Sequence, residues 1–161
     1  MRYCGIILAK ENSKRFPGKN YADLNGCELW RHAYFPLNEY CNTYVFNKYN
    51  RTPAQSLNDE PIFSALQWAY KNLPVRYDAI INILANCPEH TVDGIKKAVK
   101  MFEDLELNEL RSFNKEGTES GLMILKESYL LNRHEISTYQ GFIQLESKEI
   151  HYKEDLCQLK K

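Results

Sequence analysis

The sequence predicts an α/β protein in which a mostly parallel sheet is covered by helices on both faces. Two short apolar runs, Tyr3–Ala9 and Asp78–Leu84, are bounded by polar and turn residues, which is typical of strands buried on both faces. Longer segments before and after the second run carry apolar residues at helical spacing. Buried strands that alternate with helices are typical of parallel sheets.

The length and composition fit one folded domain, and we expect residues 1–161 to form it. The chain has 161 residues, of which 43% are hydrophobic and 26% are charged. These proportions are typical of a globular protein with a core of its own.

The charge balance argues against two classes of partner. Lys and Arg together number 21, and so do Asp and Glu. We therefore expect no nucleic-acid partner and no membrane partner, because both are usually met by a broad basic surface. No apolar run approaches the roughly 20 residues that span a bilayer. Any site for an anion must be local.

The five cysteines favour a cytoplasmic protein with reduced thiols. Their number is odd and their spacing is wide, whereas disulfide scaffolds have even numbers of closely spaced cysteines. The N-terminus has no long apolar stretch after a basic start, so no signal peptide is predicted.

The remaining elements follow from apolar spacing and capping residues. Asp59 is the predicted N-cap of a helix with Pro61 in its first turn, and Thr91 is the predicted N-cap of another. The apolar faces of these helices span 62–73 and 92–102. Further predicted helices cover 29–37, 127–131 and 152–160, and further strands cover 43–46, 110–113, 122–125 and 141–145.

A basic loop follows the first buried strand. It contains Lys10, Lys14, Arg15 and Lys19, with Glu11 as the one acid. Parallel sheets bind ligands at the carboxyl ends of their strands, so this loop is a candidate polyanion site, most simply for a nucleoside triphosphate. The alternative is a solvated basic loop, because runs of charge are often plain surface.

The loop is neither of the two common phosphate motifs. A Walker A loop requires a Ser or Thr after Gly-Lys, but Asn20 follows Gly18-Lys19, and no G-x-G-x-x-G is present. The loop does resemble the opening of the CMP-sugar synthetases, whose pattern is an apolar strand followed by A-R-x-x-S-K-x-x-P-x-K-N. Lys10 replaces the arginine of that pattern. The positions that match in register are Ala9, Ser13, Lys14, Pro17, Lys19 and Asn20.

Weaker similarity to this family covers nearly the whole chain. It includes the segments Arg51–Leu57, Asp78–His90 and Ser147–Leu156. The resemblance implies a three-layer α/β/α, Rossmann-like nucleotidyltransferase fold. It leaves the oligomeric state open, because the family's projecting dimerisation segment is shortened near residue 115.

The resemblance also implies an activity, the transfer of CMP from CTP to a small acidic sugar with release of pyrophosphate. Such a reaction depends on positioning and on neutralising phosphate charge. Lys19 and Lys10 are the implied catalytic residues. The implied nucleotide-binding residues are Lys10, Asn12, Ser13, Lys14, Lys19, Asn20 and Arg51.

The implied cofactor is Mg²⁺, but the matching positions depart from the family pattern. Of the late pair of acids only Glu149 remains, and His151 is a poor ligand for an ion that prefers oxygen. Asn86 stands where an acid of the central loop would be and is a weak ligand candidate, and Leu84 stands where the family has a sugar-contacting Gln. These departures leave an alternative open, a nucleotide-binding relative that has lost the metal site and catalysis.

A zinc site is a further alternative. Cys87 and His90 have C-x-x-H spacing, and His151 with Cys157 would have to complete the site. The competing interpretation is a buried thiol and a loop histidine. The sequence contains no G-x-S-x-G motif, which argues against an α/β hydrolase.

Overall fold

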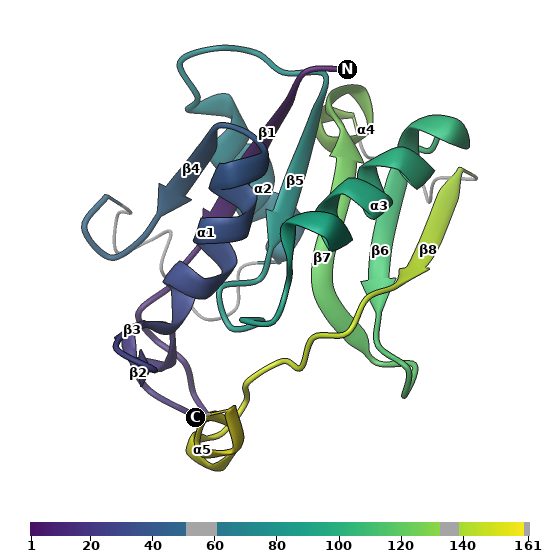
Figure 1. The fold of residues 1–161 in the computed structure, drawn as a ribbon. Coiled ribbons are helices and arrows are strands. Elements are labelled where there is room, and N and C mark those ends of the chain that lie inside the picture. Colours follow the sequence, from purple (N-terminus) through teal and green to yellow (C-terminus); the bar gives the residue numbers. More distant parts are fainter. Residues whose placement is uncertain (51–60, 133–138, 160–161) are drawn as a thin grey trace.

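The protein is a six-stranded sheet between two layers of helices (Figure 1). The structure, a computed structural model, describes residues 1–50, 61–132 and 139–159. The strand order is β4-β1-β5-β7-β6-β8. The strands are β1 (Tyr3–Leu8), β4 (Thr43–Phe46), β5 (Ala79–Ile83), β6 (Glu109–Phe113), β7 (Glu119–Lys126) and β8 (Gln140–Gln144).

The sheet is mostly parallel, as the sequence predicts. Strand β7 runs antiparallel to both of its neighbours, β5 and β6. The other neighbouring pairs, β1 with β4, β1 with β5 and β6 with β8, are parallel. All the strands except β7 therefore end at the same edge of the sheet.

Helices cover both faces of the sheet. The helices α1 (Leu29–Tyr40) and α3 (Val92–Asp104) lie on the face toward the viewer in Figure 1, and α2 (Ile62–Lys71) and α4 (Glu127–Leu131) lie behind. In β1, Ile7 belongs to the core on the first face and Ile6 to the core on the second. This confirms the predicted three-layer α/β/α architecture. No helix within the described ranges is long and apolar enough to cross a membrane.

Two helix starts and one helix end test the capping predictions. Thr91 Oγ1 accepts a hydrogen bond from Gly94 N at 3.1 Å, so the predicted cap of α3 is confirmed. Pro61 is the N-cap of α2 and does not lie in its first turn, while Asp59 is outside the described residues. Helix α1 continues through Pro36 to Tyr40. Its buried apolar face extends to Leu37, and the free energy gained by burying that face outweighs the cost of the proline in the helix.

A small hairpin was not among the predicted elements. It pairs β2 (Asp23–Leu24) with β3 (Cys27–Glu28) across Asn25-Gly26, both of which have positive φ. The Asn-Gly pair is a turn signal, but strands of two residues show no alternation. The last helix, α5 (Lys153–Leu159), packs on this hairpin through a separate apolar cluster that contains Leu24, Leu29, Ile150 and Leu156.

Candidate functional site

The carboxyl ends of β1 and β5 mark the point where the chain changes direction across the sheet. From β1 the chain crosses through α1 to β4 on one side, and it then returns through α2 to β5 on the other side. Ligands of open α/β sheets bind in the crevice at such a switch point. The basic loop leaves β1 at this edge.

A cavity of about 360 Å³ opens there, and we call it the basic cavity. This volume is within the range of small-molecule sites. Four cations line it against one carboxylate, so its field is strongly positive. The lining residues are Leu8, Lys10, Ser13, Lys14, Arg15, Lys19, Asn20, Ile62, Ala65, Leu84, Ala85, Asn86 and Glu149.

Hydrogen bonds tie the basic loop to the end of β1. Asn20 Nδ2 donates to Lys10 O at 2.9 Å, and the Tyr21 hydroxyl donates to Ala9 O at 2.7 Å. Gly18, whose φ is 71°, donates from its backbone N–H to Glu11 O at 3.2 Å. A left-handed residue closes this turn, which favours glycine there. The cations are therefore carried on a loop that is fixed at both ends.

Lys19 extends from this loop to the opposite wall of the cavity. Its Nζ donates to Ile150 O at 2.9 Å. Burial lowers the pKa of Lys19, and the nearby Glu149 carboxylate opposes that shift. A partly dehydrated ammonium interacts more strongly with an anion than one in bulk water, so this lysine is well placed to bind a phosphate.

Glu149 is held from two sides. Asn86 Nδ2 donates to Glu149 Oε1 at 3.0 Å and to Ile150 O at 2.9 Å, and His151 Nε2 lies 3.4 Å from Glu149 Oε2. The opposite amide orientation would turn the Asn86 oxygen toward two acceptors, so the nitrogen must face Glu149. Asp155 Oδ2 fixes the same segment by accepting from His151 N and Tyr152 N at 3.0 and 2.9 Å.

Solved structures share this fold across nearly the full chain, although no protein-family model and no curated protein matches the sequence. A CMP:2-keto-3-deoxy-manno-octonic acid synthetase complexed with CTP has a TM-score of 0.78 at 12% identity, over 99% of this chain and 97% of that one. A putative glucose-1-phosphate thymidylyltransferase from Bacillus anthracis, complexed with a sucrose, has a TM-score of 0.71 at 11% identity, over 98% and 93%. Rv0371C from Mycobacterium tuberculosis H37Rv, complexed with manganese, has a TM-score of 0.67 at 8% identity, over 99% and 98%.

The chain has a nucleotidyltransferase fold. This confirms the predicted similarity to the CMP-sugar synthetases at the level of the fold. Within the nucleotidyltransferase fold, most of the predicted site residues line one cavity, and these are Lys10, Ser13, Lys14, Lys19, Asn20, Asn86 and Glu149.

One predicted residue is not brought to this cavity, one lies outside the described residues, and others were missed. Asn12 is exposed on the basic loop and does not line the cavity. Arg51 lies outside the described residues. Among the missed residues, Arg15 was visible as one of the four loop cations. Ile62 and Ala65 come from α2, and only the three-dimensional fold brings that helix to the loop.

The nucleotidyltransferase fold does not gather the predicted zinc ligands. No group of three or more His, Cys, Asp or Glu side chains suited to a metal occurs in the described part of the chain. His90 is buried and its Nε2 donates to Ser120 O at 2.6 Å. Burial lowers the pKa of His90 to about 4, and this hydrogen bond opposes the shift. Cys157 is exposed and Cys87 is buried. The structure thus favours a buried thiol and a loop histidine.

Proposed function

We propose that the protein is a nucleotidyltransferase that binds CTP in the basic cavity and transfers CMP to a sugar, releasing pyrophosphate. The observation that carries this proposal is the fixed basic loop at the switch point of the sheet. Four cations meet there in one cavity. A nucleoside triphosphate carries roughly four negative charges and is normally met by several cations. The resemblance of the loop to the CMP-sugar synthetases supplies the nucleotide.

Lys19 and Lys10 are the proposed catalytic residues. Lys19 Nζ already lies at the far wall of the cavity, so it would contact the phosphates without a large rearrangement. Lys10 follows the end of β1, and Asn20 holds its carbonyl in place. Charges that are positioned in advance stabilise the transition state of phosphoryl transfer more than mobile ones do. Ser13 and Lys14 would add hydrogen bonds to the phosphates.

The nucleoside would lie against the apolar side of the cavity, which Leu8, Ile62 and Ala65 form. Asn20 is buried there, and its Oδ1 has no hydrogen-bond partner within the described ranges. Buried acceptors are usually paired, so we expect this oxygen, which lies beneath the cavity surface, to accept from a ribose hydroxyl or from the amino group of cytosine once the loop adjusts to the nucleotide. Arg51 and Asn12 remain predicted nucleotide-binding residues.

Mg²⁺ fits the site as an ion held mainly by the substrate. Magnesium sites commonly use one or two carboxylates together with substrate phosphates and water. Glu149 is the carboxylate available, and its two oxygens already face Asn86 and His151. We expect Glu149 to hold the ion, and Asn86 to position Glu149 because its nitrogen, not its oxygen, faces that carboxylate. When bound, the ion would neutralise phosphate charge.

Calorimetry and a turnover assay test the proposal. The expected result is that CTP binds, binds more tightly with Mg²⁺, and releases pyrophosphate when a sugar acceptor is added. The acidic sugars that the resemblance implies form the first part of the acceptor panel. The absence of CTP binding, with and without Mg²⁺, would contradict the proposal.

A second candidate function is a nucleotide-binding relative without turnover. The specific observation in its favour is that Glu149 stands alone as a carboxylate and is already hydrogen bonded. In that case CTP would bind with an affinity that ignores Mg²⁺, and no acceptor would release pyrophosphate. The same two measurements therefore separate the candidates.

A further inference from the structure

Two further cavities adjoin the basic cavity. The first, the acidic cavity, has a volume of about 650 Å³ and shares Glu149 with the basic cavity. The second, the apolar cavity, has a volume of about 150 Å³ and shares Ile62 and Leu84 with it. Glu119 lines both of the added cavities. The three cavities thus share wall residues, so an acceptor in either added cavity would lie near the proposed nucleotide.

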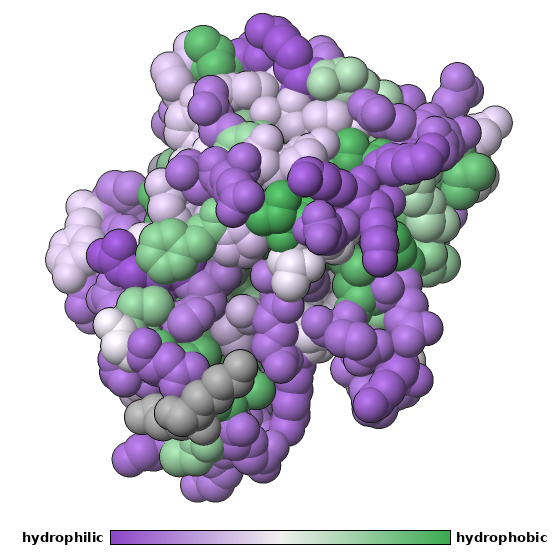
Figure 2. Space-filling view, in the orientation of Figure 1, coloured by the Kyte–Doolittle hydropathy of each residue, from purple (hydrophilic) through white to green (hydrophobic). Residues whose placement is uncertain are grey.

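The acidic cavity lies between the turn that joins β6 to β7 and the segment that leads to α5. Figure 2 shows a notch at the lower edge of the molecule between these parts, and its walls are hydrophilic. Five carboxylates line the cavity against two lysines. The carboxylates belong to Glu89, Glu116, Glu119, Glu146 and Glu149, and the lysines are Lys115 and Lys148.

The cations on this side are already matched by carboxylates. Lys148 Nζ lies 3.5 Å from Asp155 Oδ1 and donates to Gln158 Oε1 at 3.0 Å. Lys115 Nζ lies 3.9 Å from Glu116 Oε1. The acidic cavity therefore has a surplus of negative charge, whereas the basic cavity has a surplus of positive charge.

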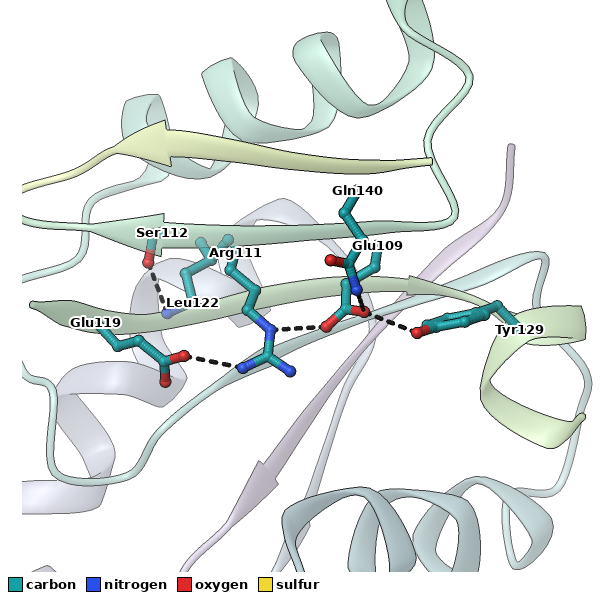
Figure 3. Close-up of polar contacts among 7 residues, drawn as sticks. All are labelled: Glu109, Arg111, Ser112, Glu119, Leu122, Tyr129 and Gln140. Carbon is teal, nitrogen blue, oxygen red and sulfur yellow. Dashed lines mark hydrogen bonds and ion pairs between the residues drawn. The ribbon is translucent and has the colours of Figure 1, made fainter. Parts of the chain in front are cut away.

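Arg111, which lines the apolar cavity, is likewise paired with carboxylates. Figure 3 shows its guanidinium between two carboxylates, with Nε donating to Glu109 Oε1 at 2.7 Å and Nη1 donating to Glu119 Oε1 at 2.8 Å. Glu109 is 1% exposed and also accepts from Tyr129 and Gln140. The single positive charge of Arg111 balances the buried Glu109 carboxylate. The Glu119 carboxylate therefore adds a net negative charge at the rim of the cavity.

An unpaired hydrogen-bond acceptor lies just beneath the wall of the apolar cavity. Asn82 lines this cavity and is 1% exposed. Its Nδ2 donates to Ile6 O at 2.8 Å, while its Oδ1 has no partner among the residues the structure describes. Buried acceptors are normally satisfied. The cavity has room for a ring substituent, and a donor on that substituent would satisfy the Asn82 oxygen once the lining side chains shift to expose it.

We propose that the apolar and acidic cavities together bind the acceptor, and that this acceptor is a sugar whose ring carries hydroxyl and amino donors and no carboxylate. This proposal rests on the proposed function and departs from the acidic sugar that the resemblance implies. Its basis is complementarity: this side of the molecule presents a surplus of carboxylates, its cations are paired with acceptors, and the unpaired Asn82 oxygen lies just beneath the cavity wall. Like charges brought together across a binding site discriminate against the wrong partner.

Three matched acceptors test the proposal: glucosamine 1-phosphate, glucose 1-phosphate and glucuronic acid 1-phosphate. They share a ring and a phosphate; relative to glucose 1-phosphate, the amino sugar carries an added ammonium group and the acid an added carboxylate. Binding is measured by ligand-detected NMR with a non-hydrolysable CTP analogue present, and turnover by pyrophosphate release with CTP. We expect the amino sugar to bind best and the acid worst, with a ratio of about tenfold between them, or about 1.4 kcal/mol for a difference of two unit charges.

Paired variants assign the preference to this site. Glu119→Gln should reduce the ratio of amino-sugar to acid binding by about threefold, while Glu39→Gln, on the exposed surface of α1, should leave it unchanged. Equal binding of the three acceptors, tightest binding of the acid, or an unchanged ratio in Glu119→Gln would overturn the proposal. Calorimetry with CTP alone tests the proposed function separately. If CTP does not bind, the acceptors and both variants are measured on the protein alone.

Discussion

The basic and acidic cavities meet at Glu149 but are built in different ways. The cations of the basic cavity all come from one stretch, Lys10–Lys19, which follows β1. The carboxylates of the acidic cavity come from separate segments after β5, in the β6–β7 turn, at the start of β7 and after β8. A short loop can thus specify the proposed nucleotide site, whereas the proposed acceptor site needs the whole sheet. Glu149 is the one carboxylate that lines both cavities, with the cations of the basic cavity on one side of it and the other carboxylates on the other side.

The largest expected effect is a loss of folding stability that leaves nucleotide binding unchanged. Arg111→Met removes the cation beside the buried Glu109, and breaking a buried ion pair in this way costs about 4 kcal/mol. Denaturant unfolding measures the loss. The control is Lys100→Met, which removes an exposed pair with Asp104 and should change stability little.

If the apolar cavity, which Arg111 lines, and the basic cavity act independently, any folded Arg111→Met protein still binds CTP as the parent does. Calorimetry at low temperature, where the variant remains folded, measures this. A large loss of CTP affinity in folded Arg111→Met protein would mean that the cavities are not separate sites.

The next effect concerns the loop that forms a wall of both cavities. Asn86 at its start lines the basic cavity, Glu89 lines the acidic one, and His90 ties the loop to β7 through Ser120 O. Burial lowers the pKa of His90 from 6.5 to about 4. The unfolded chain therefore binds a proton that the folded chain does not, in the window between these two values.

Stability from His90 is complete above pH 6.5 and is lost as the pH falls toward 4, by about 3 kcal/mol in total. Unfolding free energies measured across this window give the slope. His90→Gln keeps a donor for Ser120 O and should flatten that slope. An equally steep slope in the variant would assign the acid sensitivity to other groups.

The smallest of the three effects tests the basic cavity alone. Lys19→Ala should weaken CTP binding about 100-fold, because it removes a half-buried charge that would contact phosphate. Lys97→Ala, which removes an exposed lysine of α3, should leave the affinity within about twofold of the parent. Calorimetry compares the variants with the parent protein. Equal losses in the two variants would indicate a general charge effect and no specific site.

The same contrast explains how much of the molecule the sequence predicts. The buried strands, the Thr91 cap and the basic loop are local patterns, and they predicted the layers of the fold and the cations of the basic cavity. The contact between Asn86 and Glu149 was not predictable from spacing, because the two residues lie 63 positions apart in the chain. The same holds for Arg111 and Glu109, which are recognisable as a buried pair only once β6 is placed between β7 and β8.

The most direct test of the account is a crystal structure of the protein with CTP and Mg²⁺. The account predicts that the triphosphate lies in the basic cavity within hydrogen-bond distance of Lys19 Nζ, with the nucleoside against Ile62 and Ala65 and the acidic cavity left to solvent. A triphosphate bound beyond Glu149, among the carboxylates of the acidic cavity, would contradict it. Crystals that show no CTP, grown at a concentration well above the dissociation constant measured for CTP in solution, would also contradict it.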